Sequence, residues 1–529
     1  MMKRPSGDAL LLAALIAVHL VPIWTLSCFP SQDGPAHLAI ANILREYDGP
    51  HGQVLRDYFV RSPGAVTNWF VYAVLAYGLG FLPVALAEKV LLSAYVVLLP
   101  LAVRYAVRAV EPRNAFLAVL AVPFTYNYML GMGFYNFCFS LVAFFFGLGY
   151  WLRHRDQLGP RQTIVFALLA LWVYVCHIVS AGMLMAAVGT LGVWKSWKSR
   201  SPWRLAPTAL ALLPTLVLML AFAGGEASRI TSMPVRTKLA ELVTLASLAA
   251  YDPRTRFFGY AVAGLFAVLA AWLVAQRPAR REGWIAVLAV FVALALAVPS
   301  NIGIGGFIHQ RLSLFPFFAL ILGLAACDPP ERLRRGIRIL AAGLALGLLG
   351  MLALRWREID GYLREYVAAG ERVPAGSTLL PLCYSHRGVD LDGRELAFRV
   401  GPFLHAASRV AAAKPVADLG LYAADYEGYF PVHYRPERNP YDHIAQGPDP
   451  ERMPPWVDFL TYPKRTGGRV DYVLLWEMPP DRTHRALRSV RRQLRTRYER
   501  VWVSPRGLAE LYRFRRARTS GDRTLPTAR

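Results

Sequence analysis

The chain is dominated by apolar runs that are long enough to cross a lipid bilayer. Hydrophobic residues make up 55% of its 529 positions, and the mean hydropathy is positive. A membrane-spanning helix needs about 20 mostly apolar residues, because every backbone polar group inside the bilayer must be satisfied within the helix. The sequence therefore predicts a mainly α-helical, polytopic membrane protein. Its first run, 9–29, exceeds the roughly 7 to 15 residues of a signal-peptide core and is predicted to remain as a transmembrane helix.

The basic residues predict the orientation in the membrane. Lys and Arg number 59 against 35 acidic residues, a formal net charge of +24. Short cytoplasmic loops collect Lys and Arg, and anionic lipid headgroups attract them. No nucleic-acid-binding motif accompanies the charge, so no nucleic acid partner is predicted. The basic segments are the N-terminus, 104–113, 153–161, 195–204, 277–281 and 332–338.

Alternation between these basic loops predicts about eleven crossings with a cytoplasmic N-terminus. Three apolar segments, 9–29, 68–81 and 84–105, separate the basic N-terminus from the basic segment 104–113. Because both basic segments are expected in the cytoplasm, the chain must cross the membrane an even number of times between them. One of the three segments therefore does not cross. We assign that role to 68–81, which is short and rich in Trp and Tyr, as an interfacial helix is. Conversely, 163–194 would form a helix of about 48 Å, so two short crossings are predicted with a turn near His177. The other crossings are 84–105, 115–131, 134–152, 205–223, 258–276, 284–299, 309–327 and 337–354.

The composition changes after residue 354. The membrane domain is predicted as 1–354, a soluble α/β domain outside the cytoplasm as 355–518, and a disordered tail as 519–529. The soluble domain shows no catalytic constellation. The five scattered cysteines indicate neither a disulfide framework nor a metal site. The expected strands are 377–382, 470–476, 498–503 and 508–514, and the expected helix is 484–498.

An acid and a histidine stand at the start of the first external loop, 30–82. Asp33 directly precedes an amphipathic segment, 36–47, so its carboxylate can cap that helix. Alternatively, a carboxylate at the edge of a low-dielectric cavity can accept a proton from a hydroxyl group. His37 lies one turn further on and can share that proton transfer or bind a phosphate. The spacing alone does not choose between these interpretations.

Polar residues in the other external loops are the candidate substrate contacts. Tyr135 and Asn136 follow two glycines, where they suit either a membrane-interface belt or hydrogen bonds to a sugar or headgroup. His177 is tolerated at the predicted turn if it faces a cavity. Arg311, with His309 nearby, follows a glycine run and suits either bidentate phosphate binding or snorkelling to lipid headgroups.

These residues resemble the GT-C superfamily of membrane glycosyltransferases, which includes protein O-mannosyltransferases and aminoarabinose transferases. The resemblance rests on Gln32-Asp33-Gly34-Pro35-Ala36-His37 and on 68–80 followed by 87–90. It implies a catalytic acid at the start of the first external loop, many crossings and an external C-terminal domain. It also implies a donor sugar on a polyprenyl phosphate and an acceptor hydroxyl on a glycan, lipid or protein. Asp33 would then be the base of an inverting transfer, and Arg311 with His309 would stabilise the leaving phosphate.

One departure from the superfamily concerns metal binding. Many members carry a second acid beside the first, whereas Asp33 is followed by Gly34 and Pro35. We therefore predict no metal and no other cofactor. The localisation expected is the cell (inner) membrane. Two other function classes remain open at this point: a transporter or lipid flippase, and a non-catalytic membrane scaffold.

Overall fold

The computed structural model describes residues 6–62, 67–225, 230–276, 283–303, 305–445 and 455–515. Within these ranges, seven helices are long and apolar enough to cross a membrane, and four apolar helices are shorter. The long ones are α1 (Gly7–Thr25), α5 (Val84–Val110), α7 (Tyr135–His154), α9 (Ile178–Ser199), α12 (Arg256–Ala275), α15 with α16 (Ile308–Leu312 and Phe315–Ala325) and α17 (Glu331–Val367). The shorter ones are η2 (Pro112–Phe124), α8 (Pro160–Cys176), α10 (Ala206–Gly225) and α14 (Trp284–Ala297).

Each predicted crossing segment coincides with one of these helices, and the mainly helical polytopic fold is confirmed. The long apolar stretch 163–194 is broken at His177, whose extended backbone separates α8 from α9. The segment 68–81 forms a short helix, α4 (Phe70–Ala73), which continues as the π-helical η1 (Val74–Gly78). The basic loop 277–281 and the tail 519–529 lie outside the described residues.

The short apolar segment at Pro112–Phe124, where the sequence predicts a crossing, is unusual because it is a 3-10 helix of 13 residues. A 3-10 helix rises about 2.0 Å per residue, so this segment extends about 26 Å, where an α-helix of equal length would extend about 20 Å. The tighter winding therefore lets a short segment cover most of the thickness of the hydrocarbon core. Other short elements are α3 (Gln53–Tyr58), α6 (Tyr128–Gly131), α11 (Val235–Val243), α19 (Pro440–His443), α20 (Tyr462–Thr466), β2 (Ile230–Thr231) and β3 (Asn301–Ile302).

The C-terminal part is built on a five-stranded sheet in the order β5-β4-β7-β9-β8. The strands are β4 (Thr378–Cys383), β5 (Ala417–Asp418), β7 (Tyr472–Trp476), β8 (Tyr498–Val503) and β9 (Ala509–Phe514), and α21 (Arg485–Arg497) is the helix between β7 and β8. β4 pairs in parallel with β5 and β7, whereas β9 pairs antiparallel with β7 and β8. The four predicted strands and the helix are confirmed. The boundary expected after residue 354 falls inside α17, which continues to Val367 and packs Tyr366 on Trp476.

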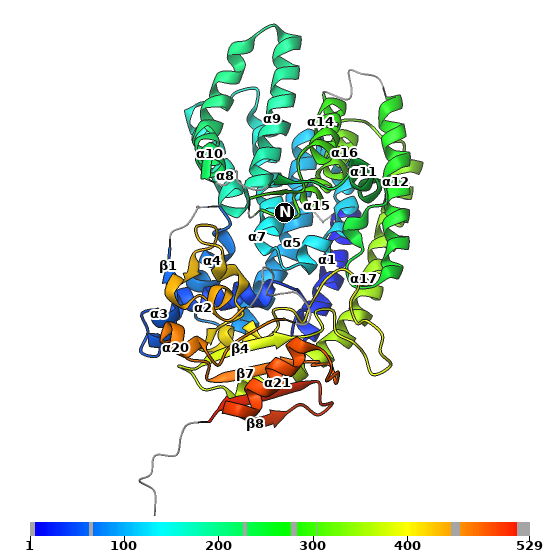
Figure 1. The fold of residues 1–529 in the computed structure, drawn as a ribbon. Coiled ribbons are helices and arrows are strands. Elements are labelled where there is room, and N and C mark those ends of the chain that lie inside the picture. The colour runs from blue at the N-terminus through cyan, green and yellow to red at the C-terminus, as the bar shows by residue number, and fades with distance from the viewer. Residues whose placement is uncertain are drawn as a thin grey trace, which may run out of the picture.

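The C-terminal part is fastened to the first loop rather than held apart from it. β1 (Phe59–Arg61) pairs antiparallel with β6 (Val432–Tyr434). α18 (Ser408–Ala413) packs against α2 (Gly34–Glu46), where the Asn42 amide donates to the Ala411 carbonyl (2.8 Å). In Figure 1, α2, α3, α4 and the sheet gather at one end of the molecule, and the apolar helices fill the other.

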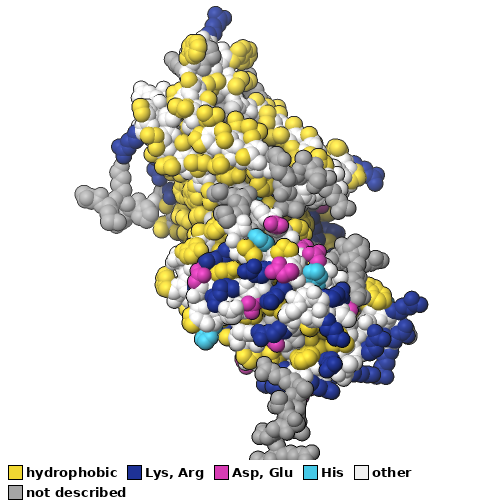
Figure 2. Space-filling model, turned by 60° about the vertical axis from the view of Figure 1, so that its left-hand side comes forward, with side chains coloured by type: hydrophobic (Ala, Val, Ile, Leu, Met, Phe, Trp, Pro, Cys, Tyr) yellow, Lys and Arg dark blue, Asp and Glu magenta, His cyan; other side chains and the backbone are white. Residues whose placement is uncertain are grey.

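The molecular surface divides in the same way. Figure 2 shows hydrophobic side chains over the helical end and a mixture of basic and acidic side chains over the other. Large apolar side chains such as Leu168, Leu213 and Val268 are exposed on the outside of the helices. An apolar belt of this extent is the surface that lipid chains cover in a membrane protein.

Candidate active site

A cavity of about 250 Å³ lies where the helix bundle meets the first loop and the C-terminal part. Its wall includes five residues that the sequence singled out: Asp33, His37, Asn136, His177 and Arg311. They come from the start of α2, the start of α7, the α8–α9 break and α15. Segments that are far apart in the chain therefore bring an acid, a cation and several hydrogen-bonding groups to one enclosed space.

The Asp33 side chain faces this cavity and does not cap α2. Asp33 precedes the helix but makes no capping hydrogen bond, and it is only 5% exposed. Its Oδ2 accepts a hydrogen bond from the Tyr422 hydroxyl (2.8 Å), and its Oδ1 accepts one from Gln32 Nε2 (3.1 Å). Side chains therefore orient the carboxylate, which does not accept a hydrogen bond from the first backbone amides of α2.

Close backbone packing holds Asp33 in place. The amide groups of Gln32 and Asp33 donate to the carbonyls of Gly131 and Met132 (3.0 Å each). Gly133 has φ +84°, and a Cβ there would lie 2.3 Å from the amide nitrogen of Gly34. Only glycine combines this backbone conformation with so close an approach. The glycines of 131–133 therefore serve to seat the acid against the start of α7.

His37 is a buried, neutral group. Its Nδ1 is hydrogen-bonded to the Tyr72 hydroxyl (2.7 Å). Burial lowers the pKa of His37 to about 4, since removing the charged form from water is unfavourable. At neutral pH its ring therefore acts as a hydrogen-bonding group and not as a cation for a phosphate.

This burial makes the protein sensitive to acid. The unfolded chain binds a proton on His37 near pH 6.5, whereas the folded chain binds it only near pH 4. We expect the free energy of unfolding to fall as the pH drops from 6.5 to about 4, by up to about 3 kcal/mol from this group, and then to level off. Denaturant titrations of the wild type and of His37→Gln at several pH values measure the effect. A wild-type slope equal to that of the variant across this window would contradict it.

Arg311 lies at the cavity without an acidic partner among the described residues. Its guanidinium packs over the Phe134 ring (4.5 Å to the centroid) and donates to the Gly306 carbonyl, while its Nε has no hydrogen bond. The buried Nδ2 of Asn68 and Nε2 of His177 also lack partners. Buried polar groups are normally hydrogen-bonded. Three such atoms therefore belong to residues that line one cavity.

The other candidate residues have structural partners. Asn136 lines the cavity, but its Oδ1 accepts from the Val71 amide (2.8 Å) and its Nδ2 donates to the Asn68 carbonyl (2.7 Å), so it ties α4 to α7. Tyr135 and His309 are not among the residues that line the cavity. The Tyr135 hydroxyl contacts Glu88, and His309 Nδ1 contacts the Ala295 carbonyl. We therefore assign neither of these two side chains to substrate binding.

The C-terminal part contributes residues that the sequence analysis missed. Tyr422, Tyr426, Tyr429 and Phe430 line the cavity together with Arg311, and His405 Nε2 lies 3.8 Å from Asp33 Oδ1. We expected no catalytic constellation within the C-terminal part itself, but its residues complete a cavity that it shares with the first loop and the helix bundle. The dense aromatic run from Tyr422 to Phe430 is the signal that could have revealed it, because aromatic faces are common in ligand sites. No cluster of three or more metal-binding side chains occurs in the described ranges.

Fold and cavity together define a polytopic membrane protein whose first loop and C-terminal part close over a polar site at the end of the helix bundle. Comparison with solved structures shows the same architecture in the crystal structure of ArnT from Cupriavidus metallidurans bound to undecaprenyl phosphate. The TM-score is 0.57 at 13% sequence identity, and the match covers 95% of this chain and 97% of that one. No protein family model and no curated protein matches the sequence. The chain thus shares its overall fold with that structure, in line with the resemblance to GT-C membrane glycosyltransferases.

Proposed function

We propose that the protein is a glycosyltransferase that moves a sugar from a polyprenyl phosphate to an acceptor hydroxyl group. The observation that carries this proposal is the cavity itself, which is lined by a buried carboxylate, by a guanidinium without an acidic partner among the described residues and by residues with unsatisfied donors. The undecaprenyl phosphate in the ArnT crystal structure supports a lipid carrier as donor. No nucleotide-binding motif is needed, because the donor reaches the site through the membrane.

In this reaction Asp33 is the general base. The acceptor oxygen forms a bond to the anomeric carbon while the bond from that carbon to the phosphate oxygen breaks and its electron pair stays on the phosphate. The acceptor proton passes to Asp33, which Tyr422 holds in position. Attack from the side opposite the phosphate inverts the configuration at the anomeric carbon.

Arg311 stabilises the leaving phosphate. A guanidinium matches the oxygens of a phosphate by two parallel hydrogen bonds, and the unpaired nitrogen atoms of Asn68 and His177 add donors from neighbouring walls. These groups are preorganised around the place where negative charge develops, which is how electrostatic stabilisation of a transition state is most effective. Tyr426, Tyr429 and Phe430 supply aromatic faces for the sugar ring.

The site is proposed to lie on the non-cytoplasmic face of the cell membrane. The basic segments 104–113, 153–161 and 332–338 include the ends of α5 and α7 and the first turns of α17, and short basic segments at helix ends stay in the cytoplasm. The loops that build the cavity alternate with these basic loops along the chain. The N-terminus is then cytoplasmic, and the C-terminal part extracytoplasmic.

A donor-turnover assay tests the proposed function. The purified protein is placed in lipid nanodiscs and in sealed vesicles with a labelled polyprenyl-phosphate sugar and extracted cell-envelope acceptors. We expect free polyprenyl phosphate and a labelled acceptor to form together. A flippase would instead move the intact donor across the vesicle membrane, and a scaffold would leave the donor unchanged and in place. Either of these results would overturn the proposal.

Arg311 provides a second test of the site. We expect Arg311→Gln to lower kcat/KM by about 10- to 150-fold, because a charged hydrogen bond is worth about 1.5–3 kcal/mol. Arg311→Lys keeps the charge but loses the bidentate geometry and should fall between the wild type and Arg311→Gln. The matched control is Arg61→Gln. Arg61 belongs to the first loop, is partly exposed and pairs with Asp48 of that loop. Equal losses in both glutamine variants would argue against a phosphate at Arg311.

A further inference from the structure

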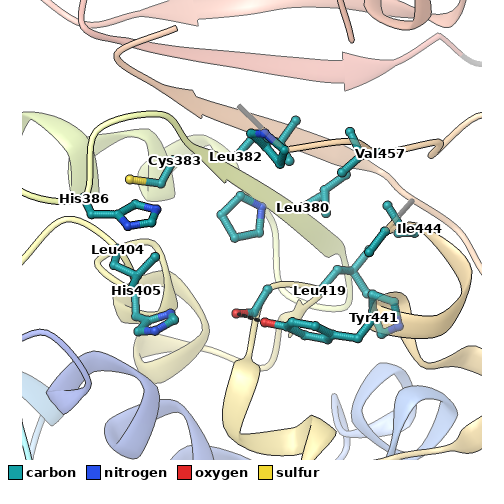
Figure 3. Close-up of a pocket in the computed structure, with 15 residues that line it drawn as sticks. Leu380, Leu382, Cys383, His386, Leu404, His405, Leu419, Tyr441, Ile444 and Val457 are labelled. Carbon is teal, nitrogen blue, oxygen red and sulfur yellow. Dashed lines mark hydrogen bonds between the residues drawn. The ribbon is translucent and has the colours of Figure 1, made fainter. Parts of the chain in front are cut away.

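A second cavity, of about 90 Å³, lies inside the C-terminal part (Figure 3). Leucines of β4 and Leu419 form an apolar wall, and His386, His405 and Tyr441 supply polar groups. In Figure 3, His386 and His405 lie at the same end of this cavity, below Cys383. A space of this size holds a few water molecules when polar partners line it. His386, Gly420 and Tyr441 are partly exposed, so the cavity communicates with solvent.

His405 separates this second cavity from the candidate active site. Its side chain lines the second cavity, and its Nε2 lies 3.8 Å from Asp33 Oδ1. The His405 ring also stacks on Tyr422, with 4.4 Å between centroids, and the Tyr422 hydroxyl donates to the other oxygen of Asp33. The carboxylate is therefore contacted by the C-terminal part on one side and open to the active-site cavity on the other.

The His405 ring is in the form that can both accept and release a proton. Burial, together with smaller contributions from the neighbouring His386 and His37, lowers the pKa of His405 to about 3. A neutral imidazole has one ring nitrogen with a hydrogen and one with a free lone pair. The charged and titratable groups that face it are Asp33 and His37 near the start of α2, His386 after β4, and Tyr422.

The proposed reaction leaves a proton on Asp33 after each transfer. During turnover the sugar and the acceptor occupy the active-site cavity, so they cover the face of Asp33 that opens into it. The opposite side of the carboxylate is the one that His405 approaches. Catalytic hydrogen bonds are often long in an empty site and shorten when substrate binds. A contact of 3.8 Å is therefore close enough to become a direct hydrogen bond in the substrate complex.

We propose that His405 is a positioning residue that passes the proton from Asp33 to water in the second cavity. This inference rests on the proposed function. The proton moves from the Asp33 carboxyl to one ring nitrogen of His405 as the proton on the other ring nitrogen moves to water. Asp33 returns to the carboxylate form, one proton reaches the solvent, and no further reactant is consumed. The ring regains its first tautomer when it rotates away from Asp33, so that water in the second cavity takes the proton from the nitrogen that received it and returns one to the other nitrogen.

Chemical rescue tests this relay. We expect His405→Ala and His405→Gln to lower kcat about 100-fold with little change in KM, the lower end of the effect of losing a proton-transfer group. Added imidazole should restore activity to His405→Ala, whose vacated space adjoins the second cavity. It should not restore His405→Phe, where the new ring fills the space and keeps the stack on Tyr422. His443→Ala is the control, since His443 lies in the same part of the chain, is partly exposed and does not line the second cavity.

Each result decides the matter. Loss with rescue by imidazole in His405→Ala alone supports the relay. Wild-type kcat in His405→Gln or in His405→Phe overturns it, because neither side chain carries a proton in this way. Loss without rescue, in a variant whose thermal unfolding matches the wild type, also overturns it. Both of these results leave the proposed function intact if Asp33→Asn is inactive. A wild-type protein that transfers no sugar would overturn the proposed function and the relay together.

Discussion

Asp33→Asn is expected to lower kcat for sugar transfer by about 10³- to 10⁴-fold, the upper range for loss of a general base. Asparagine has nearly the shape of aspartate, and its amide oxygen can still accept the hydrogen bond from Tyr422. However, the neutral amide cannot take the proton from the hydroxyl group of the sugar acceptor at neutral pH. The protein should therefore fold and bind donor normally while chemistry fails.

Rates of labelled-sugar transfer and the thermal unfolding temperature of both proteins measure this effect. The control is Asp48→Asn, which changes an acid of the same loop whose side chain is 70% exposed and pairs with Arg61. We expect that variant to transfer sugar at the wild-type rate. An Asp33→Asn protein that retains a tenth or more of the wild-type rate would exclude Asp33 as the base.

Arg409→Met is expected to destabilise the protein by about 3–5 kcal/mol, because it leaves a buried charge without its partner. Arg409 donates to both oxygens of Glu88 (2.7 and 3.2 Å) and to the Phe29 carbonyl (2.9 Å). Glu88 is 2% exposed and lies at the start of α5. The pair joins α5 to α18, which packs on α2 next to Asp33, so its loss should also loosen Asp33.

Urea unfolding in detergent, followed by tryptophan fluorescence, measures this destabilisation. The double variant Glu88→Leu with Arg409→Met removes both charges and should recover most of the lost stability, since an apolar pair of similar volume is often as stable as a buried ion pair. Arg61→Met provides the exposed comparison, and we expect it to cost less than about 1 kcal/mol. Similar losses from Arg61→Met and Arg409→Met would show that the buried pair contributes nothing special.

The membrane helices could be predicted because their signal is local. A helix that spans lipid must be apolar over consecutive residues, and charge parity between neighbouring loops then separates crossing from non-crossing segments. The same parity predicts a break near His177, and α8 gives way to α9 at that residue. The strands β7 and β9 were also predictable, since apolar and β-branched runs of that length are typical of buried strands.

The partners of Asp33 could not be predicted from local pattern. Tyr422 lies 389 positions further along the chain, and it reaches Asp33 because α18 packs on α2 and β6 pairs with β1. Those contacts involve short elements with weak sequence signals. For the same reason, closeness in sequence did not reveal which neighbouring residues line the cavity. Asn136 and Arg311 line it, whereas Tyr135 and His309 do not. Helical rotation turned the latter two towards Glu88 and Ala295.

The sequence by itself determined the apolar helices, four of the five strands of the C-terminal sheet and the candidate acid, because each has a signal within a few consecutive residues. Only the tertiary structure decided that Asp33 faces a cavity instead of capping α2, and that Tyr422 and His405 approach it. The physical reason is that a side chain's environment depends on the packing of distant segments. Whether a carboxylate caps a helix or serves a cavity is settled by what those segments place around it.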